Sequence, residues 1–343
     1  MMAAPRHLLV IRFSALGDIA MTIPVMKNLL QQNPALEITF VSVPFVKPLF
    51  DEIDRLHFYG ADIQNEFKGL TGLYQLSKKI KKEISFDAIA DLHDVLRTKI
   101  LRFLLGKTSA VIDKGRKEKK ELTRALHKKL RPLKTGFQRY ADVFETLSLV
   151  ITLDVQQGYS KLAADSSLLP IEKNNSILIG IAPFAKHAAK MYPLQKMEQL
   201  VNLLLKNEHI QLLVFAAKNE TAAIARWASK SNNLHLMAGK LTLQQELNTI
   251  SQLDMMISMD SANMHLASLF GIPVISIWGG THPFAGFYGW GQAYENIVQT
   301  NLPCRPSSVF GNKDCPLHGA AGCMQQISPE MICEKVEQVM KIR

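Results

Sequence analysis

The sequence predicts an α/β protein with two open, mostly parallel sheets. Short runs of aliphatic and β-branched residues alternate along the chain with longer segments of helical period, the pattern of repeated strand-helix units. The 343 residues suffice for two domains of roughly 150 residues each. A polar, turn-rich stretch over 154–176 separates the two sets of runs and is expected to be the linker. The first domain is therefore expected over 1–160 and the second over 176–343.

The apolar runs give the expected strands in each half. They are 8–13, 37–43, 86–92 and 110–112 in the first half, and 177–182, 211–216, 234–237, 255–259 and 274–278 in the second. Strands that are apolar almost throughout need helices on both faces of their sheet. Ligands of such sheets bind at the carboxyl ends of the strands, so the site is expected in a cleft between the two domains.

Composition excludes several classes of protein. With 47% hydrophobic and 20% charged residues, disordered, collagen-like and coiled-coil chains are poor fits. No stretch approaches the roughly 18 consecutive apolar residues of a membrane span, and the N-terminal apolar run is too short for a signal peptide. Four cysteines in a chain of this length form no disulfide framework. These features favour the cytoplasm.

Positive charge is concentrated in one segment. The formal net charge is +10, and the stretch 113–134 holds ten basic residues against three acidic ones. Part of it, from Lys119 to Leu130, is expected to be a helix with a solvated basic face and with Leu122, Leu126 and Leu130 on the other side. The segment has no aromatic residue to stack on bases. A phosphorylated lipid or an anionic membrane surface is therefore favoured over nucleic acid.

The first motif is Arg12-Phe-Ser-Ala-Leu-Gly-Asp18, between the first strand and a helix expected to begin near Ile19. Small residues such as Ser14 and Gly17 allow a sharp turn at the strand end, where free N–H groups suit an anion. Asp18 either caps the helix, a contribution of about 1 kcal/mol, or serves in a site, and its position alone does not decide. The motif is neither a dinucleotide fingerprint nor a P-loop.

The second motif is Asp260-Ser-Ala-Asn-Met-His265, again between a strand and a helix. Asp260 and Ser261 are good N-cap residues, and the N–H group of Ala262 would lie in a first turn that suits a phosphate. His265 could reach the same anion or pack in the core, and packing is favoured from the residue alone.

The third motif is a loop over 182–193 that carries Lys186 and Lys190. Lysine is a compact point charge that could neutralise a diphosphate leaving group. Solvated surface lysines are the alternative.

Four metal-ligand types fall close together near the end of the chain, in the pattern Cys304-x10-Cys315-x2-His318-x4-Cys323. Zinc sites usually contain a Cys-x2-4-Cys pair, which this pattern lacks. Packed thiols in an irregular loop are favoured, and no metal is predicted.

Together, segments 12–25, 260–274 and 278–283 strongly resemble glycosyltransferase family 9, the ADP-heptose:lipopolysaccharide heptosyltransferases. The resemblance covers nearly the whole chain. It implies a GT-B architecture of two Rossmann-like domains, with the acceptor on 1–160, the nucleotide-sugar on 176–343 and the last helix packing back on the first domain. It also implies an inverting enzyme that needs no metal and no other cofactor.

On the donor side, Lys190 matches the family lysine that contacts the donor, and Asp260 matches the donor-binding aspartate. Lys186 stands where well-known members carry a Thr-Thr pair, and the donor-side acidic position falls on either Lys218 or Glu220. The resemblance places the diphosphate or adenine beside Leu241, Ser261, Ala262 and His265.

For the acceptor side, Asp18 matches the family aspartate proposed as general base. Arg139, in Gln138-Arg139-Tyr140, resembles the family's acceptor-side arginine, and Ser14, Lys117 and Lys120 are expected to bind the acceptor too. Relatives often carry Cys-x-Pro-Cys near the C-terminus, whereas 304–307 here lacks the second cysteine, which weakens the metal interpretation.

The expected function is transfer of heptose from ADP-heptose to a lipid A-linked sugar of the lipopolysaccharide inner core. The expected partners are the ADP-sugar, the core oligosaccharide acceptor and the anionic inner face of the cytoplasmic membrane, with no nucleic acid. Two alternatives remain open: a family member with another nucleotide-sugar donor, and a non-catalytic protein of this fold that binds a nucleotide or polyanion.

Overall fold

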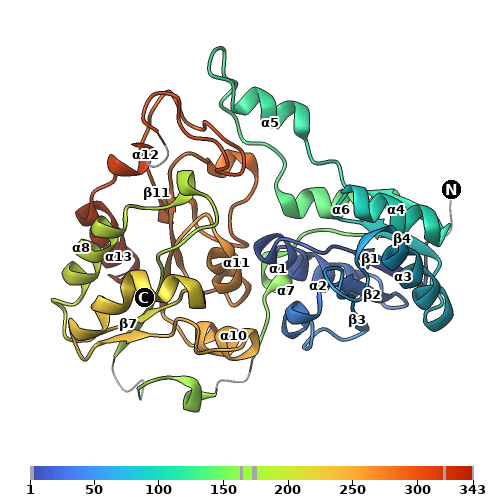
Figure 1. Cartoon of the computed structure of the whole chain (residues 1–343), viewed down its shortest axis with the longest axis horizontal. Coiled ribbons are helices and arrows are strands. Elements are labelled where there is room, and N and C mark those ends of the chain that lie inside the picture. Colours follow the sequence, from blue (N-terminus) through green and yellow to red (C-terminus); the bar gives the residue numbers. More distant parts are fainter. Residues whose placement is uncertain (1–3, 163–164, 172–175, 320–321, 342–343) are drawn as a thin grey trace. The chain divides into compact units, whose positions relative to one another are not determined.

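The computed structural model describes residues 4–162, 165–171, 176–319 and 322–341. The chain forms two compact units, each with its own parallel sheet (Figure 1). Unit 1 comprises Met1–Lys114 and Gly136–Ser160, and unit 2 comprises Gly115–Thr135 and Lys161–Arg343. The expected α/β class with two Rossmann-like sheets is confirmed. The basic segment, which lies within the first half of the sequence, is grouped with unit 2.

The sheet of unit 1 has the order β3-β2-β1-β4-β5, with every pair parallel. Its strands are β1 (His7–Ile11), β2 (Glu37–Ser42), β3 (Leu56–Gly60), β4 (Ala88–Asp91) and β5 (Thr108–Val111). Figure 1 shows α3 (Gly69–Glu83) and α4 (Leu96–Leu105) on one side of this sheet and α2 (Thr22–Gln32) and α7 (Val155–Gly158) on the other. Leu76 of α3 and Leu101 of α4 share a core with Ile11, as strands buried on both faces require.

The remaining helices of unit 1 are short or cover the strand ends. They are α1 (Leu16–Ala20), α6 (Gly136–Thr146) and the 3-10 helix η1 (Pro44–Leu49).

The sheet of unit 2 has the order β11-β10-β9-β6-β7-β8, also parallel. Its strands are β6 (Ile177–Ala182), β7 (Ile210–Val214), β8 (Leu234–Leu236), β9 (Met255–Met259), β10 (Val274–Trp278) and β11 (Ile297–Gln299). Its helices are α5 (Arg116–Leu122), α8 (Leu194–Leu204), α9 (Thr221–Ile224), α10 (Leu243–Ser251), α11 (Ala262–Leu269), α12 (Gly322–Gln325) and α13 (Pro329–Lys341).

The last helix, α13, packs against α8 within unit 2. Its Ile332 and Val336 are fully buried in the same cluster as Leu200 of α8 and Ile277 of β10. Its apolar face is therefore buried within unit 2.

Every predicted strand segment overlaps an observed strand, whereas β3 and β11 were not predicted. Both lie at the edge of their sheet. Edge strands bury less of their surface, so they do not need the continuous apolar run by which a central strand is recognised.

The predicted helix from Lys119 to Leu130 is wrong beyond Leu122, where α5 ends. Leu126 and Leu130 are 77% and 49% exposed. The physical reason is that Leu122 and Leu133 are buried in one cluster with Ala285. A continuous helix would hold these two leucines about 16 Å apart, so the chain turns back instead and the Lys129 N–H donates to the Glu121 carbonyl.

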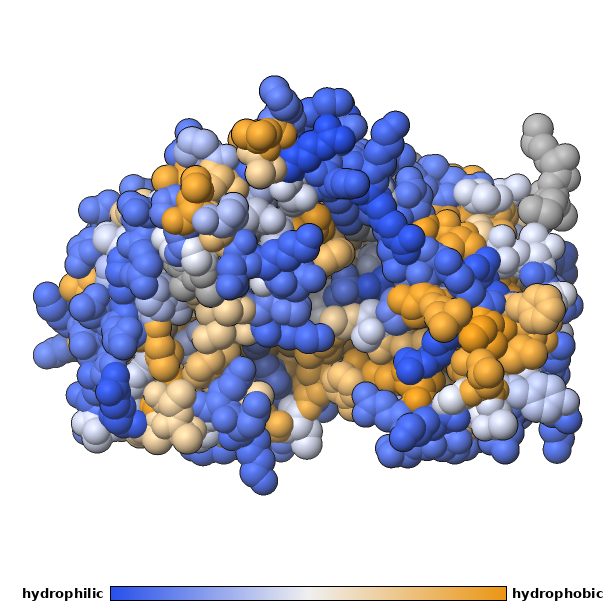
Figure 2. All heavy atoms as spheres, turned by 45° about the horizontal axis from the view of Figure 1, so that its top comes forward, coloured by the Kyte–Doolittle hydropathy of each residue, from blue (hydrophilic) through white to orange (hydrophobic). Residues whose placement is uncertain are grey.

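The predicted linker over 154–176 contains the boundary between the two units, at Ser160 and Lys161. Residues 163–164 and 172–175 of this linker lie outside the described residues. Among the helices of the described part, none is long and apolar enough to cross a bilayer. Figure 2 shows hydrophilic side chains over much of one face, with hydrophobic patches between them; the most exposed large hydrophobic residues include Leu96 and Phe103 of α4.

Candidate functional site

An ion pair stands at the carboxyl end of β1. Arg12 follows the strand directly and is buried, and its Nη2 lies 2.9 Å from Oδ2 of Asp18. The same guanidinium donates to the Leu92 carbonyl and lies over the Tyr140 ring, 5.5 Å from its centroid. Burial alone would lower the pKa of Arg12. The neighbouring Tyr140 and Asp18 outweigh this effect, so the pKa of Arg12 is raised. Arg12 is thus a fixed cation that orients the Asp18 carboxylate.

The helix that carries Asp18 begins at Leu16, earlier than the predicted start near Ile19. Asp18 therefore lies inside the first turn of α1, and its carboxylate accepts a hydrogen bond from the Ala15 N–H at 3.3 Å. The Tyr140 hydroxyl donates to the Asp18 carbonyl at 3.3 Å. The Asp18 carboxylate thus accepts from an N–H group at the start of the helix and pairs with Arg12 at the same time. A third of the Asp18 side chain is exposed.

His93, which was not predicted, also lies at this edge of the sheet, just after β4. Its Nδ1 accepts from the Phe13 N–H at 3.4 Å, so Nε2 carries the proton and donates to the Ser14 hydroxyl at 3.3 Å. Burial, and then the positive charges of Arg12 and Lys114, lower the pKa of His93 to about 4, so the ring is neutral near pH 7. The signal was present in the sequence: the polar pair His93-Asp94 directly follows a predicted strand.

The structure separates the remaining acceptor candidates. Arg139 lies on α6 of unit 1, is 3% exposed, and donates to the Asp113 carbonyl at 3.0 Å. Lys117 and Lys120 are exposed on α5, which belongs to unit 2. Their neighbour Lys119 is buried, with Nζ 4.4 Å from the centre of the Phe287 ring. Ser14 and Arg139 therefore share a unit with Asp18, whereas Lys117 and Lys120 do not.

A second ion pair stands at the carboxyl edge of the sheet in unit 2. Asp260 follows β9, and its Oδ2 lies 2.7 Å from Lys190 Nζ; the two side chains are 4% and 15% exposed. Lys190 ends the 3-10 turn η3 (Ala188–Lys190), and the Gly280 N–H donates to the Ala189 carbonyl at 2.9 Å. Burying a charged side chain is costly unless it is paired with an opposite charge. Lys190 and Asp260 pair with each other.

The start of α11 adjoins this pair. Ser261 is the N-cap residue and Ala262 is the first helical residue, as predicted from their types. Unsatisfied N–H groups of a first turn and the helix dipole both favour an anion. His265, one turn further on, is buried. Asn263 is held by Glu246, to which its amide donates at 2.9 Å.

The other donor candidates lie beyond the carboxyl ends of β6, β7 and β8. The Gly239 N–H donates to the Ala216 carbonyl, so the turn at Gly239 lies next to the end of β7. Leu241, two residues further on, is half-buried. Gly239 has a φ of +66° and the backbone of Lys218 lies against it. Glu220 closes its own turn, since its carboxylate accepts from the Ala217 N–H at 2.8 Å. Lys186 is exposed on the loop after β6.

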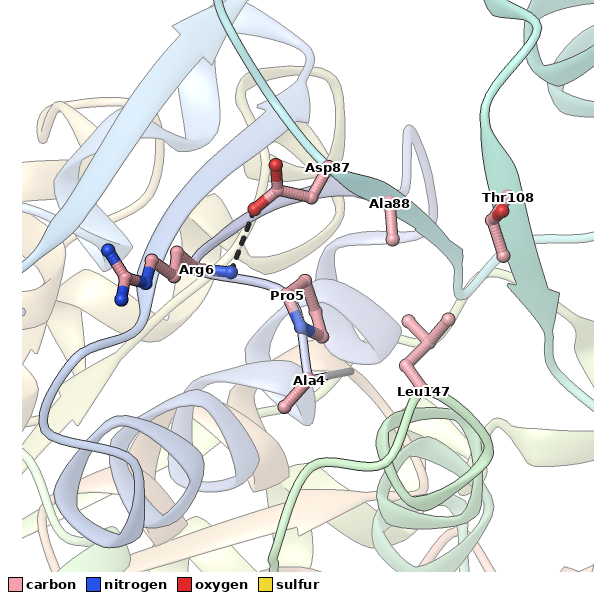
Figure 3. A pocket seen from close by; sticks show the side chains of 7 residues that line it. All are labelled: Ala4, Pro5, Arg6, Asp87, Ala88, Thr108 and Leu147. Atoms are coloured by element: carbon pink, nitrogen blue, oxygen red, sulfur yellow. Dashed lines mark hydrogen bonds between the residues drawn. The ribbon is translucent and has the colours of Figure 1, made fainter. Parts of the chain in front are cut away.

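A cavity of about 350 Å³ lies at the opposite edge of the first sheet (Figure 3). It is bordered by the amino ends of β1, β4 and β5, where the Asp87 carboxylate accepts from the Arg6 N–H at 2.8 Å. Its lining is Ala4, Pro5, Arg6, Asp87, Ala88, Thr108 and Leu147. No predicted site residue is among them, and parallel sheets bind ligands at the other edge. The cavity is therefore not the candidate site.

The four cysteine and histidine residues of the C-terminal loop are brought together by the fold. The ligand atoms of Cys304, Cys315, His318 and Cys323 all lie within 4.8 Å of one another. The sequence placed these four residues close together, but packed thiols were favoured over a metal site because the pattern lacks a Cys-x2-4-Cys pair.

Comparison with known proteins gives one family and several relatives. The model of glycosyltransferase family 9 (heptosyltransferase) matches residues 73–317. Lipopolysaccharide core heptosyltransferase OpsX of Haemophilus influenzae is 22% identical over 320 residues, which is 89% of each chain. The structure of E. coli ADP-heptose lps heptosyltransferase II superposes with a TM-score of 0.71, 15% identity and 98% of each chain covered. E. coli heptosyltransferase WaaC with ADP gives a TM-score of 0.70 at 14% identity, covering 97% of this chain and 99% of that one.

Proposed function

Because the chain belongs to glycosyltransferase family 9, a family of GT-B enzymes, we propose that it transfers heptose from ADP-heptose to a lipid A-linked sugar of the lipopolysaccharide inner core. Two kinds of observation support this reaction. One similar protein is a lipopolysaccharide core heptosyltransferase, and a structure of the same fold was determined with ADP. The two ion pairs stand at strand ends where this fold binds its ligands.

On the donor side, Lys190, Asp260 and the first turn of α11 bind the nucleotide-sugar. Lys190 is held by Asp260 at 2.7 Å, so its charge is already in place when the diphosphate arrives. Negative charge that develops on departing ADP is stabilised by Lys190 and by the N–H groups near Ser261 and Ala262. These groups supply the electrostatic stabilisation that a divalent ion provides in other transferases, so transfer itself needs no metal. Lys186, Glu220, Leu241 and His265 complete the proposed donor site.

On the acceptor side, Asp18 is the general base. The acceptor hydroxyl oxygen attacks the anomeric carbon, its proton passes to the Asp18 carboxylate, and the bond from that carbon to the ADP oxygen breaks, so the configuration inverts. A positioned base of this kind contributes roughly 10²- to 10⁴-fold. Arg12 orients the carboxylate, and Ser14, held by His93, offers a hydroxyl to the acceptor sugar.

The contact that carries the assignment is the one between Arg12 and Asp18, because it presents a partly exposed, oriented carboxylate at a strand end. The test is Asp18→Asn in the full chain. Transfer is expected to be abolished while ADP affinity, measured by calorimetry, stays within a few-fold. Asp51→Asn, which removes a surface carboxylate paired with nearby Lys47, is the matched control. Unchanged turnover in Asp18→Asn would reject the base.

Donor identity is tested by calorimetric comparison of ADP, UDP and GDP. Preference for ADP is expected, and selectivity for UDP would exclude the proposed donor. Mass spectrometry of lipopolysaccharide from a deletion strain then identifies the acceptor, because the core should end at one defined sugar.

The proposed location is the inner face of the cytoplasmic membrane, with Lys117 and Lys120 facing the phosphorylated acceptor or lipid headgroups. Arg139, buried on α6, is proposed to act on the acceptor side within unit 1. Support comes from the exposure of both lysines on α5 and from the excess of positive charge over 113–134. Such a segment is attracted to anionic lipid by about 1 kcal/mol for each basic residue near the surface.

A further inference from the structure

Three thiols and one imidazole converge between β11 and α13, three of these residues on the irregular loop and Cys323 on the short helix α12. The Cys304 Sγ lies 3.5 Å from His318 Nδ1 and 3.9 Å from the Cys323 Sγ. The Cys315 Sγ lies 3.6 Å from the same Nδ1. All four ligand atoms are within 4.8 Å of one another, so they surround a single point.

Three of these separations match those of a tetrahedral metal site, and all of them lie within 4.8 Å. With metal–sulfur bonds of about 2.3 Å and metal–nitrogen bonds of about 2.0–2.1 Å, tetrahedral angles place sulfur and nitrogen about 3.5 Å apart and two sulfurs about 3.8 Å apart. The observed values are 3.5, 3.6 and 3.9 Å. A disulfide would need the two sulfurs about 2.05 Å apart, so Cys304 and Cys323 are not bonded to each other.

The backbone presents two of these ligands together. Cys315 and Gly319 exchange two backbone hydrogen bonds, at 3.1 and 2.9 Å, and Gly319 has a φ of +72°. This tight turn holds Cys315 and His318 on one side. Cys315-x2-His318 therefore provides the close ligand pair that the sequence lacks as Cys-x2-4-Cys.

Basic side chains support the cluster from outside. Lys128 Nζ donates to the carbonyl oxygens of Cys304 at 2.8 Å and Pro306 at 3.0 Å. The Arg305 guanidinium is buried and donates to the Thr281 carbonyl at 3.0 Å. Three thiolates around a divalent ion carry a net charge of −1, which the adjacent cations offset. The bond from Lys128 also fixes the backbone at Cys304, one of the four residues of the cluster.

We propose that Cys304, Cys315, His318 and Cys323 bind one divalent transition-metal ion, Zn²⁺ by its ligand set, as a structural site. Sulfur and imidazole in a tetrahedral arrangement select ions of this class. Four protein ligands leave no open position for a substrate, which is typical of structural zinc. The proposal replaces the expectation of packed thiols and is compatible with transfer chemistry that needs no metal.

The ion would fix a loop that contacts Lys190. Between the first two ligands lies Gly311, whose backbone rests against Lys190: a Cβ at this glycine would be 2.6 Å from the Lys190 Cγ. The N–H groups of Ser307 and Ser308 donate to the Gly280 carbonyl at 3.0 and 3.1 Å. Loss of the ion should therefore also weaken ADP binding, a consequence that rests on the proposed function.

The primary test measures metal in the untagged full chain, purified under reducing conditions, by mass spectrometry. About one tetrahedral ion per chain is expected, with little in Cys315→Ser or Cys323→Ser. Cys333→Ser is the matched control because Cys333 lies on α13, outside the cluster, and its metal content should be unchanged. Replacement by Co²⁺ should give the thiolate charge-transfer absorption of a tetrahedral site in wild type and control.

Since the serine variants could fail to fold, a second measurement uses wild-type protein only. Added Zn²⁺ should protect three of the four cysteines of the reduced, metal-free chain from alkylation, whereas the alkylation of Cys333 should be the same with and without Zn²⁺. Absence of stoichiometric metal after reconstitution, or equal alkylation with and without Zn²⁺, would overturn the proposal. Neither readout involves transfer, so failure here is distinguishable from failure of the proposed function.

Discussion

Arg12 and Asp18 form a 2.9 Å ion pair across the turn that joins β1 to α1. The arginine is buried under Tyr140 while the carboxylate stays partly exposed. An immobile cation thus fixes the direction of a carboxylate that solvent and ligands can still reach.

Replacement of this arginine should slow transfer without preventing folding. Arg12→Lys keeps the charge but loses the planar fork that reaches both Asp18 and the Leu92 carbonyl. A lost charge-assisted hydrogen bond of about 1.5–3 kcal/mol predicts a turnover reduced roughly 10- to 100-fold. Steady-state kinetics measure it. Arg55→Lys is the control, because Arg55 also donates to backbone carbonyls in unit 1; an equal loss in both variants would contradict the assigned role.

Neutral His93 makes the protein less stable in acid. Its pKa is about 4 in the folded chain and about 6.5 when unfolded, so the unfolded state binds more protons between these values. The unfolding free energy should therefore fall as the pH drops through 6.5 towards 4, by about 2 kcal/mol between pH 7 and pH 5.

Urea denaturation at pH 7 and pH 5 measures this loss. His93→Gln should reduce the difference between the two pH values, whereas His57→Gln, at an exposed histidine of the same unit, should leave it unchanged. The same pH dependence in all three proteins would show that His93 does not contribute.

Breaking the pair between Lys190 and Asp260 should affect both stability and donor binding. Lys190→Met leaves a buried carboxylate without its 2.7 Å partner, a loss of about 3–5 kcal/mol in comparable cases. ADP affinity should fall at least tenfold. Thermal unfolding and calorimetry test the two effects, and Lys206→Met, at an exposed lysine of the same unit, should change neither. Normal ADP affinity in Lys190→Met would remove this lysine from the donor site.

Alanine substitutions at Gly311 and Gly106 distinguish the effect of backbone strain from the effect of the contact with Lys190. Gly311→Ala strains a left-handed φ of +74° and also forces the new methyl group into the Lys190 side chain. Gly106→Ala strains a similar φ of +67°, but nothing lies within 4 Å of its Cβ position. Strain alone costs on the order of 1 kcal/mol. Gly311→Ala should unfold at a lower temperature than the control and bind ADP more weakly; identical behaviour would show that the Lys190 contact is unimportant.

The basic segment should drive binding to anionic lipid. Lys117→Glu combined with Lys120→Glu reverses two exposed charges of α5, so sedimentation with vesicles of anionic phospholipid should fall several-fold and wild-type binding should weaken with added salt. Lys78→Glu combined with Lys81→Glu, on α3 of unit 1, is the control. Equal loss in both double variants would indicate dependence on net charge alone.

Central strands and the start of α11 could be predicted because their signals are local. The runs that became β6, β9 and β10 are apolar at their buried positions except at Gly180, Ser258 and Ser276. Ser261 stands at the N-cap of α11, as its residue type predicts, although its side chain makes no capping hydrogen bond. The edge strand β3 was not predicted because His57 is exposed and Tyr59 is half-buried, so the strand lacks a continuous apolar run. The helix over 119–130 was overestimated because its leucine spacing is helical, whereas burial of Leu122 beside Leu133 requires a turn.

The sequence by itself determined the two α/β units, the family and the position of Asp18, Lys190 and Asp260 at strand ends, because periodicity and strand-end motifs are properties of neighbouring residues. Only the tertiary structure decided that Arg12 pairs with Asp18, that His93 holds Ser14, and that three cysteines and His318 meet at one point. These contacts join different elements or distant parts of a loop. Their geometry follows from how the chain packs, which spacing along the sequence does not encode.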